Sequence, residues 1–534
     1  MRRFSSYGPV DTSLHYFVPR EKLIEKACVQ LMGENPEQGG HYITVWAPRQ
    51  CGKSWIMNKT MWKLAENERF HVLKLELEYL KTTKDPDEIV SSIAERIIDR
   101  LKHKNICPGT CIKNIKEFDK LFTSQVLDKP LILILDEFDA LTEEAITGLA
   151  GAFRNIYNNR RSDPNPSHKK EYLLHGIALI GVRSVLGIEN VKGSPFNVQR
   201  SLHIPKLTYE ETCSMFYQYE QETGQKVEQE VIDLVFYETQ GQPGLVSWFG
   251  ELLTEGYDQY VPDHSRSITA EDFKYVYEDA LNVLPNNTVL NIISKARQEP
   301  YKGLVLEFFR TKEKQLFRFD EKHINFLYMN GVIDPEKQDK TYIRFSCPFV
   351  QKRLFNYFSY ELFRYMGKIL EPFEDTSDTI TETGLNITNL LRRYERHLKK
   401  NREWMFQDAP RRKDLRIYEA VFHFNLYEFI NSFLANKKAK VWPEFPTGNG
   451  KIDLMIQYAG KLYGLELKSY TDDSDFRISL QQAARYGKTL KLDLIWLVEF
   501  VEYIPEGYRE KYEQEYNDKD SGVVVKPVFV ATGE

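Results

Sequence analysis

Residues 47–54 constrain the fold most, because they combine a phosphate-binding loop pattern with the context that such a loop requires. Their sequence, Ala-Pro-Arg-Gln-Cys-Gly-Lys-Ser, lies between a short apolar run at residues 43–46 and a helix-like stretch at residues 55–64. A strand, a loop and a helix in this order place backbone N–H groups and a helix N-terminus around an anion. The G-x-x-x-x-G-K-[ST] pattern is broken at its first position by Ala47, so the entering turn must tolerate a Cβ atom.

This loop predicts a site for ATP with Mg²⁺. Lys53 is expected to reach the outer phosphates, and the Ser54 hydroxyl is expected to bind the magnesium ion. The preceding residues that would contribute to the phosphate cradle are Gln50, Cys51 and Gly52.

A second sequence element, at residues 131–137, supports the prediction of a nucleotide site. The apolar run at residues 131–135 leads directly into Asp136 and Glu137, as a buried central strand that ends in acids would do. Asp136 is predicted to hold Mg²⁺ through water, and Glu137 to align the attacking water as a base. The alternative is a core strand followed by an acidic N-cap for the helix near Glu143.

Length and composition predict several folded domains. The chain has 534 residues, of which 42% are hydrophobic and 13% aromatic, and its net charge is −5. Any nucleic-acid surface must therefore be a local patch. No leader-like segment follows Met1 and no apolar run reaches membrane-spanning length, so we expect a soluble cytoplasmic protein without a membrane partner. The six cysteines are scattered and are interpreted as free thiols.

The pattern along the chain predicts an α/β multidomain protein. Five strand-like runs separated by crossover-length stretches indicate a parallel P-loop sheet, and helices, a two-stranded wing and a second α/β domain follow. The winged helix is expected to contact DNA or to serve only as a packing domain. The expected domains are a core at 1–206, a helical lid at 207–285, a winged helix at 286–365, a linker with a basic helix at 366–410, and a carboxyl-terminal domain at 411–534.

The basic segment at residues 391–416 is the strongest nucleic-acid footprint in the sequence. It holds ten Lys or Arg residues against four Asp or Glu residues. The alternative is a solvated helix face, which is the usual meaning of a charge run.

Two strand-like runs near the carboxyl terminus predict a β-hairpin. A two-residue loop at 459–460 would pair Asp453 with Glu466, whereas a loop at 460–461 would pair Asp453 with Lys468. Side chains alternate with period two, so all three lie on one face in either register.

Such a face predicts a metal-dependent phosphodiesterase site. Asp453 and Glu466 would bind one Mg²⁺ or Mn²⁺ ion, and Lys468 would steer an activated water. Gln482 and Tyr486 lie four residues apart on one side of the following helix, and on an earlier helix Glu419 is the candidate acid. The alternative is a surface salt bridge on a hairpin.

Two known families resemble these segments. Asp453, residues 466–468 and residues 482–486 resemble the core of the PD-(D/E)XK nuclease superfamily, including its Q-x-x-x-Y helix. Residues 17–23, 47–54, 135–141, 181–183 and 241–243 resemble the ORC/Cdc6-like and STAND-type AAA+ ATPases, and the whole chain resembles bacterial AAA-like proteins with a carboxyl-terminal nuclease domain.

The ATPase resemblance implies further roles. Arg183 would sense the γ-phosphate, while Arg20 and Pro243 would line the nucleotide. An arginine finger at Arg154, Arg160 or Arg161 would imply a homo-oligomer, and structural salt bridging is the alternative.

Three functions compete. The first is an ATP-regulated, Mg²⁺-dependent DNA endonuclease or exonuclease, in the context of defence against foreign DNA. The second is a nucleotide-switched DNA-binding or scaffold protein whose nuclease-like domain does not cut. The third, a DNA motor or loader with nuclease trimming, lacks any helicase motif beyond the two phosphate-site elements.

Overall fold

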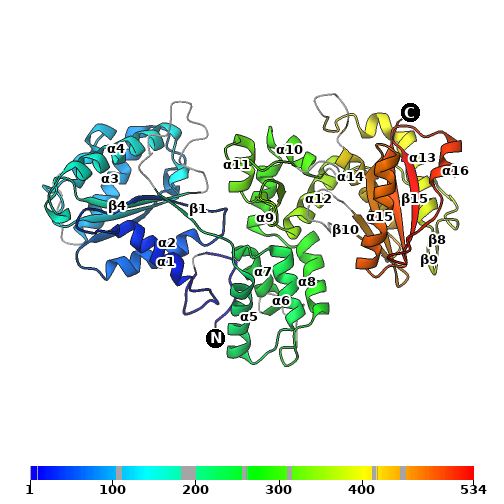
Figure 1. Cartoon of the computed structure of the whole chain (residues 1–534), viewed down its shortest axis with the longest axis horizontal. Helices are drawn as coiled ribbons and strands as arrows, with labels where there is room; N and C mark the ends of the chain where they lie inside the picture. Colours follow the sequence, from blue (N-terminus) through cyan, green and yellow to red (C-terminus); the bar gives the residue numbers. More distant parts are fainter. Residues whose placement is uncertain are drawn as a thin grey trace. The chain divides into compact units, whose positions relative to one another are not determined.

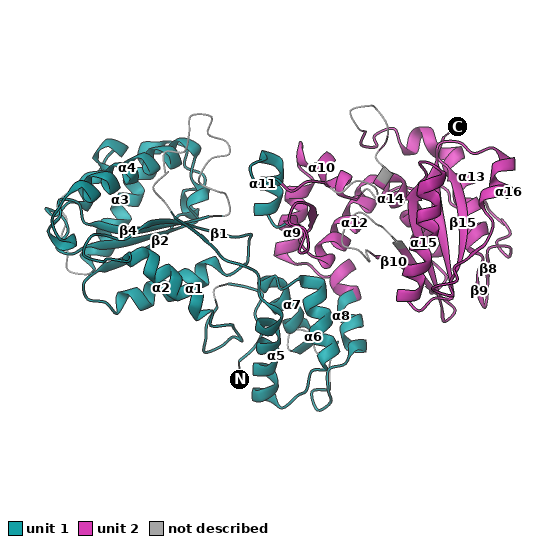
Figure 2. Cartoon of the chain, viewed as in Figure 1, with its two compact units in different colours: residues 1–277, 318–331 teal, residues 278–317, 332–534 magenta. Residues whose placement is uncertain are grey.

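The computed structural model divides into two compact units (Figure 2). The amino-terminal unit comprises Met1–Tyr277 with Arg318–Gly331, and the carboxyl-terminal unit comprises Glu278–Phe317 with Val332–Glu534. The structure describes residues 2–8, 10–103, 111–181, 200–254, 260, 263–309, 315–411, 417, 419–444 and 453–533.

The amino-terminal unit is built on a parallel sheet (Figure 1). Its strands have the order β2-β3-β4-β1-β5. Its three inner strands are almost entirely buried, as expected for a sheet covered on both faces. The five predicted strands are confirmed. They are β1 (Tyr42–Trp46), β2 (His71–Glu76), β3 (Leu131–Asp136), β4 (Leu174–Gly181) and β5 (Arg200–His203).

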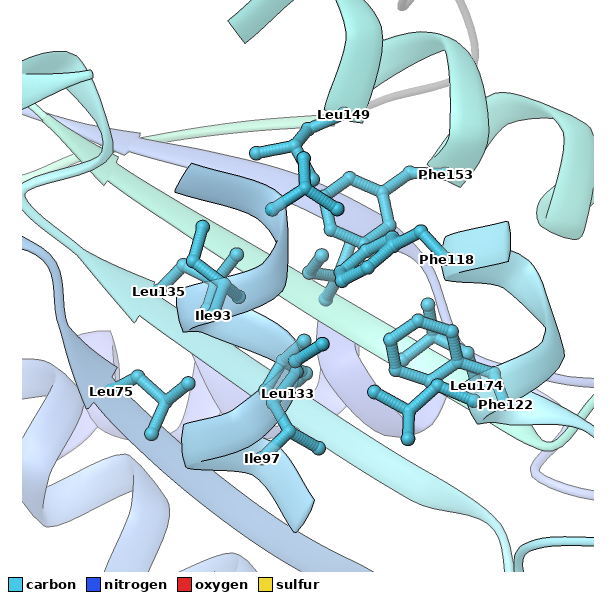
Figure 3. Packing of buried hydrophobic residues seen from close by; sticks show 14 of the residues in the cluster. Leu75, Ile93, Ile97, Phe118, Phe122, Leu133, Leu135, Leu149, Phe153 and Leu174 are labelled. Atoms are coloured by element: carbon cyan, nitrogen blue, oxygen red, sulfur yellow. The ribbon is translucent and has the colours of Figure 1, made fainter. Parts of the chain in front are cut away.

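Helices cover both faces of this sheet. Helices α1 (Glu21–Met32) and α2 (Lys53–Ala65) pack on one face, and α3 (Pro86–Lys102) and α4 (Glu143–Ser162) pack on the other (Figure 1). Figure 3 shows the second core, in which leucines of β3 meet Ile93 and Ile97 of α3 and Phe153 of α4. Short 3-10 helices lie at η1 (Glu78–Leu80), η2 (Ile115–Phe122), η3 (Phe138–Ala140) and η4 (Ser167–Lys169).

A helical group follows β5, as the sequence predicts. Thr208 and Glu211 form a capping box that starts α5, because each side chain accepts a hydrogen bond from the other residue's backbone N–H. Gln240 and Gly241 have positive φ angles of 49° and 73°, and they separate two helices. The helices are α5 (Tyr209–Thr223), α6 (Gln229–Thr239), α7 (Pro243–Thr254) and α8 (Ala270–Asn282).

The middle of the chain contains helices and a two-stranded antiparallel sheet, β6 (Ile333–Pro335) with β7 (Ile343–Phe345). The helices are α9 (Asn287–Ala296), α10 (Tyr301–Phe308), α11 (Lys322–Met329) and α12 (Pro348–Phe363). This order agrees with the predicted elements, but α11 belongs to the amino-terminal unit and the others to the carboxyl-terminal unit. The winged-helix assignment and the predicted domain boundaries stay predictions.

The carboxyl-terminal unit contains a mixed sheet with the order β10-β11-β12-β13-β15-β14. Its strands are β10 (Lys440–Glu444), β11 (Asp453–Tyr458), β12 (Lys461–Ser469), β13 (Leu494–Val501), β14 (Tyr516–Asn517) and β15 (Val524–Ala531). The helices are α13 (Ile387–Met405), α14 (Glu419–Leu434), α15 (Asp473–Thr489) and α16 (Glu506–Tyr512). The segment 371–384, within the region predicted as a linker with a basic helix (366–410), carries β8 (Ile380–Thr381) and leads into β9 (Gly384–Leu385).

Candidate nucleotide and metal sites

The loop between β1 and α2 has the predicted strand, loop and helix context. Among the described residues, its positive φ angles belong to Gln50 (54°) and Gly52 (84°). Ala47 is buried and does not use this conformation, so a Cβ atom is tolerated where the pattern usually has glycine. Cys51 is buried, whereas Ser54 is exposed in the first turn of α2.

Lys53 begins α2 and points back over the loop. Its ammonium donates hydrogen bonds to the Ala47 and Pro48 carbonyl oxygens, each at 3.0 Å. Burial lowers the pKa of Lys53, while the carboxylates of Asp139 and Asp136 act in the opposite direction. The carbonyl oxygens are neutral, so a bound phosphate would supply the negative charge that the Lys53 ammonium lacks there.

Asp136 ends β3 at the same edge of the sheet. Strands β3 and β1 are separated only by β4, so their ends lie about 10 Å apart, which is two strand spacings. The Asp136 carboxylate accepts the Glu137 backbone N–H at 3.0 Å and lies 2.9 Å from the Lys74 ammonium. The predicted magnesium acid is therefore buried and ion-paired.

Glu137 follows in a left-handed conformation with a φ of 56°, and its side chain is exposed. Partial desolvation raises the pKa of Glu137, and the carboxylates of Glu78, Asp136 and Asp139 raise it further. A carboxylate with a raised pKa is suited to accept a proton from water. The geometry is compatible with the predicted base.

The start of α7 adjoins the phosphate-binding loop. Gln242 Nε2 donates to the Arg49 carbonyl at 3.1 Å. A Cβ atom on Gly244 would approach Gln50 Oε1 to 2.4 Å, so this glycine allows close contact between the lid and the loop. Pro243 lies between these two contacts, beside the predicted nucleotide site.

The arginines to which the family resemblance assigns roles at the nucleotide have different surroundings in the structure. The Arg20 guanidinium donates to the Pro205 and Lys206 carbonyl groups and pairs with Glu211 at 2.9 Å, so it ties the core to α5. Arg160 is buried and bonded to the Ser167 and Tyr172 carbonyl oxygens, which makes it a structural residue rather than a finger. Arg183 lies outside the described residues.

The carboxyl-terminal hairpin has the first of the two predicted registers. Tyr458 pairs with Lys461, so the loop is Ala459 and Gly460, and Asp453 lies opposite Glu466. Both loop residues have positive φ angles, 51° and 74°, as a type I′ turn requires. The alternative pairing of Asp453 with Lys468 is therefore wrong.

Glu466 and Lys468 are deeply buried, with 1% and 4% of their surface exposed. The Lys468 ammonium lies 3.2 Å from Glu466 Oε1, yet neither Glu466 oxygen accepts a hydrogen bond from the described residues. A buried carboxylate in this state has an incomplete set of partners. Its remaining lone pairs fit a hard cation, which prefers carboxylate oxygens.

Helix α15 covers the face that carries these two residues. Glu466 is in register with Leu497, and Leu497 packs in the core beneath α15. The half-buried Gln482 and Tyr486 belong to this helix, so the structure brings them to the predicted face. The Glu419 and Asp453 side chains lie outside the described part of the chain.

Two further polar residues lie at this site, and of these Glu499 escaped the sequence reasoning. Glu499 of β13 is 1% exposed and in register with Lys468 on the parallel neighbouring strand. His423 of α14 is fully buried, and burial with the Lys468 charge lowers its pKa to about 3. A lone polar residue inside an apolar run was the available signal for Glu499. Within the described side chains, no three His, Cys, Asp or Glu residues gather closely enough to hold a metal ion.

The basic helix α13 uses much of its charge internally. Four of its cations are bonded within the carboxyl-terminal unit, and the cations at 412–416 lie outside the described residues. This favours the structural interpretation of the basic segment for those four residues. The bonds join Arg392 to Glu513 and Phe529, Arg393 to Glu374 and Asp378, Lys400 to Glu371, and Arg402 to Thr532.

The parallel sheet, the phosphate-binding loop and the acids at the end of β3 form a P-loop ATPase-like core. Residues 6–254 match the family described as an AAA-like domain. The amino-terminal region is therefore of the AAA-like ATPase kind, and the match ends before the mixed sheet begins.

Solved structures with some similarity include a Walker-type ATPase of Pyrococcus abyssi, with 14% identity, a TM-score of 0.43, and coverage of 66% of this chain and 99% of that one. The ORC1 protein of Aeropyrum pernix in complex with DNA has 15% identity, a TM-score of 0.33, and coverage of 63% and 92%. The RuvB Holliday junction branch migration motor of Thermotoga maritima has 13% identity, a TM-score of 0.34, and coverage of 60% and 91%. Because all three TM-scores are below 0.5, no function of this chain is inferred from these structures.

No curated protein matches the sequence. In the described part of the chain, every helix is too short or too polar to cross a membrane.

Proposed function

We propose that this chain is an ATP-hydrolysing switch that controls a Mg²⁺-dependent DNA nuclease site in its carboxyl-terminal unit. The nucleotide would bind at the loop between β1 and α2, with Lys53 at its phosphates, Ser54 and Asp136 at Mg²⁺, and Glu137 at the attacking water. Differences between the ATP and ADP states would be transmitted through α7, because Gln242, directly before this helix, contacts the loop at Arg49.

The nuclease proposal depends on one observation, the Glu466 carboxylate, which is 1% exposed and accepts no hydrogen bond from the described residues. Burying an ion without full compensation is costly, so such a group usually has a functional partner. Asp453 occupies the opposing register position on β11 and would complete the cation site. Lys468 would leave its pairing with Glu466 to stabilise charge on the scissile phosphate. Mn²⁺ is expected to substitute for Mg²⁺.

The Lys468–Glu466 ion pair also favours a second candidate function. If the pair is permanent, it neutralises both groups, and the domain would bind DNA without cutting it. The chain would then be a nucleotide-switched DNA-binding protein or scaffold.

A cleavage assay separates the two functions. Purified full-length chain is incubated with plasmid, linear and single-stranded DNA in Mg²⁺ or Mn²⁺, with and without ATP. We expect cleavage that is lost in Glu466→Gln and becomes insensitive to nucleotide in Lys53→Ala. The matched controls are Glu502→Gln and Lys63→Ala, which change exposed residues outside the two sites. Salt-sensitive binding without cleavage by the unmodified chain would instead support the DNA-binding function.

A further inference from the structure

Lys74 brings a buried cation to the acid at the end of β3. It lies in β2, the strand next to β3 at the edge of the parallel sheet, and its ammonium is 2.9 Å from Asp136 Oδ2. The two side chains are 7% and 5% exposed. The ammonium is also 3.6 Å from Glu76 Oε1. The pair is therefore shielded from solvent and fixed in one geometry.

Alternation along the strands places this pair on the nucleotide side of the sheet. Val72 faces the core beneath α1 and α2, and Lys74 lies two residues further along the same strand. Ile134 belongs to the same core, and Asp136 again lies two residues further. Helix α2 begins with Lys53, so Lys74 and Asp136 share the face on which the phosphates are expected.

Both oxygens of the Asp136 carboxylate have a donor. Oδ1 accepts the Glu137 backbone N–H at 3.0 Å, and Oδ2 faces the Lys74 ammonium. Two donors on opposite oxygens prevent rotation of the carboxylate. Each oxygen keeps a further lone pair for a metal-bound water. Mg²⁺ demands nearly ideal octahedral geometry, so a fixed orientation of its acid matters.

We propose that Lys74 is a positioning residue that orients Asp136 toward the magnesium ion of the bound nucleotide. This inference rests on the proposed ATP hydrolysis. Lys74 touches neither the nucleotide nor the metal in this role, and it acts through the carboxylate that it holds.

A purely structural ion pair would behave differently in a metal-dependence experiment. Replacing a buried ion pair by apolar groups is often neutral for stability, so stability alone does not test the role. Orientation of a metal acid should instead change turnover and metal preference, because Mn²⁺ ligand geometry is less demanding than that of Mg²⁺.

The experiment measures ATP hydrolysis by the full-length chain in Mg²⁺ and in Mn²⁺. In Lys74→Met we expect kcat in Mg²⁺ to fall about tenfold, because the Asp136 carboxylate loses the cation paired with it, with KM for ATP changed less than twofold. The ratio of Mn²⁺ to Mg²⁺ activity should rise at least threefold. Lys74→Arg keeps the charge but moves the N–H groups. Its ratio of Mn²⁺ to Mg²⁺ activity should therefore lie between those of the unmodified chain and Lys74→Met.

Val72→Ala is the matched control, because it weakens the same strand face without touching Asp136. Its metal ratio should equal that of the unmodified chain. An unchanged ratio in both Lys74 variants would overturn the proposal, and if Lys74→Met does not fold, Lys74→Arg decides alone. If the unmodified chain hydrolyses no ATP, the proposed function fails. The Lys74 role is then decided by whether Mg²⁺ strengthens binding of a fluorescent ATP analogue less in the variants than in the unmodified chain.

Discussion

Glu428 on α14 should make the stability of the carboxyl-terminal unit depend on pH. Burial raises the pKa of Glu428 from its ordinary value of 4.5 to about 7, and no ion pair to it exists among the described residues. The folded state then holds the proton more tightly than the unfolded state. The Glu428 contribution to stability is therefore highest below pH 4.5, falls as the pH rises toward 7, and stays constant above that.

The size of this effect follows from the two pKa values. A difference of about 2.5 pH units, at about 1.4 kcal/mol each, sets an upper limit of about 3.5 kcal/mol. Glu428→Gln removes the titrating group, so its advantage over the unmodified chain should be small at pH 4.5 and grow to about 2–3 kcal/mol at pH 8. With a pKa of about 7, the Glu428 carboxyl is about half protonated at pH 7.

Differential scanning calorimetry of the full-length chain at several pH values provides the measurement, read from the transition of the carboxyl-terminal unit. The control is Glu502→Gln, an exposed glutamate whose replacement should leave the pH dependence unchanged. A Glu428→Gln advantage of constant size between pH 4.5 and pH 8 would refute the reasoning.

Three further outcomes are expected. Leu133→Ala removes a fully buried side chain from the core in Figure 3 and should cost about 2–5 kcal/mol in the thermal transition of the amino-terminal unit; a cost below 1 kcal/mol would contradict that packing. Ala459→Gly should stabilise the hairpin by about 0.5–1 kcal/mol in denaturant titrations, because Ala459 has a φ of 51°, whereas Gly460→Ala should destabilise it. Glu137→Gln should bind a fluorescent ATP analogue normally but hydrolyse ATP about 100-fold more slowly, and equal turnover would exclude it as the base.

The features predicted correctly depend on local periodicity. Continuous apolar runs marked the buried strands of the first sheet, because a central parallel strand has no solvent face. The hairpin was predicted by its tight turn, and the positive φ of Ala459 and Gly460 selects one register from the two left open. The structure, not the sequence, places Asp453 opposite Glu466 rather than Lys468.

The features that escaped prediction depend on the order of strands in space. Lys74 meets Asp136 because β2 lies beside β3, and Glu499 lies beside Lys468 because β13 is parallel to β12. A single sequence does not specify these neighbours, since several crossover orders suit the same apolar runs. The sequence shows lone polar residues within the strands, but it does not show which residues of the adjacent strands they meet.

Burial of charge therefore separates the two candidate nucleic-acid features of the carboxyl-terminal unit. In α13, Arg393 and Arg402 have protein acceptors that the folded chain supplies, so their number in the sequence overstates the charge available to DNA. Glu466 is the opposite case, because it is 1% exposed and accepts no hydrogen bond from the described residues. A ligand is better inferred from an incompletely satisfied buried charge than from a count of exposed ones. The cation site proposed at Glu466 is for this reason the stronger of the two functional inferences.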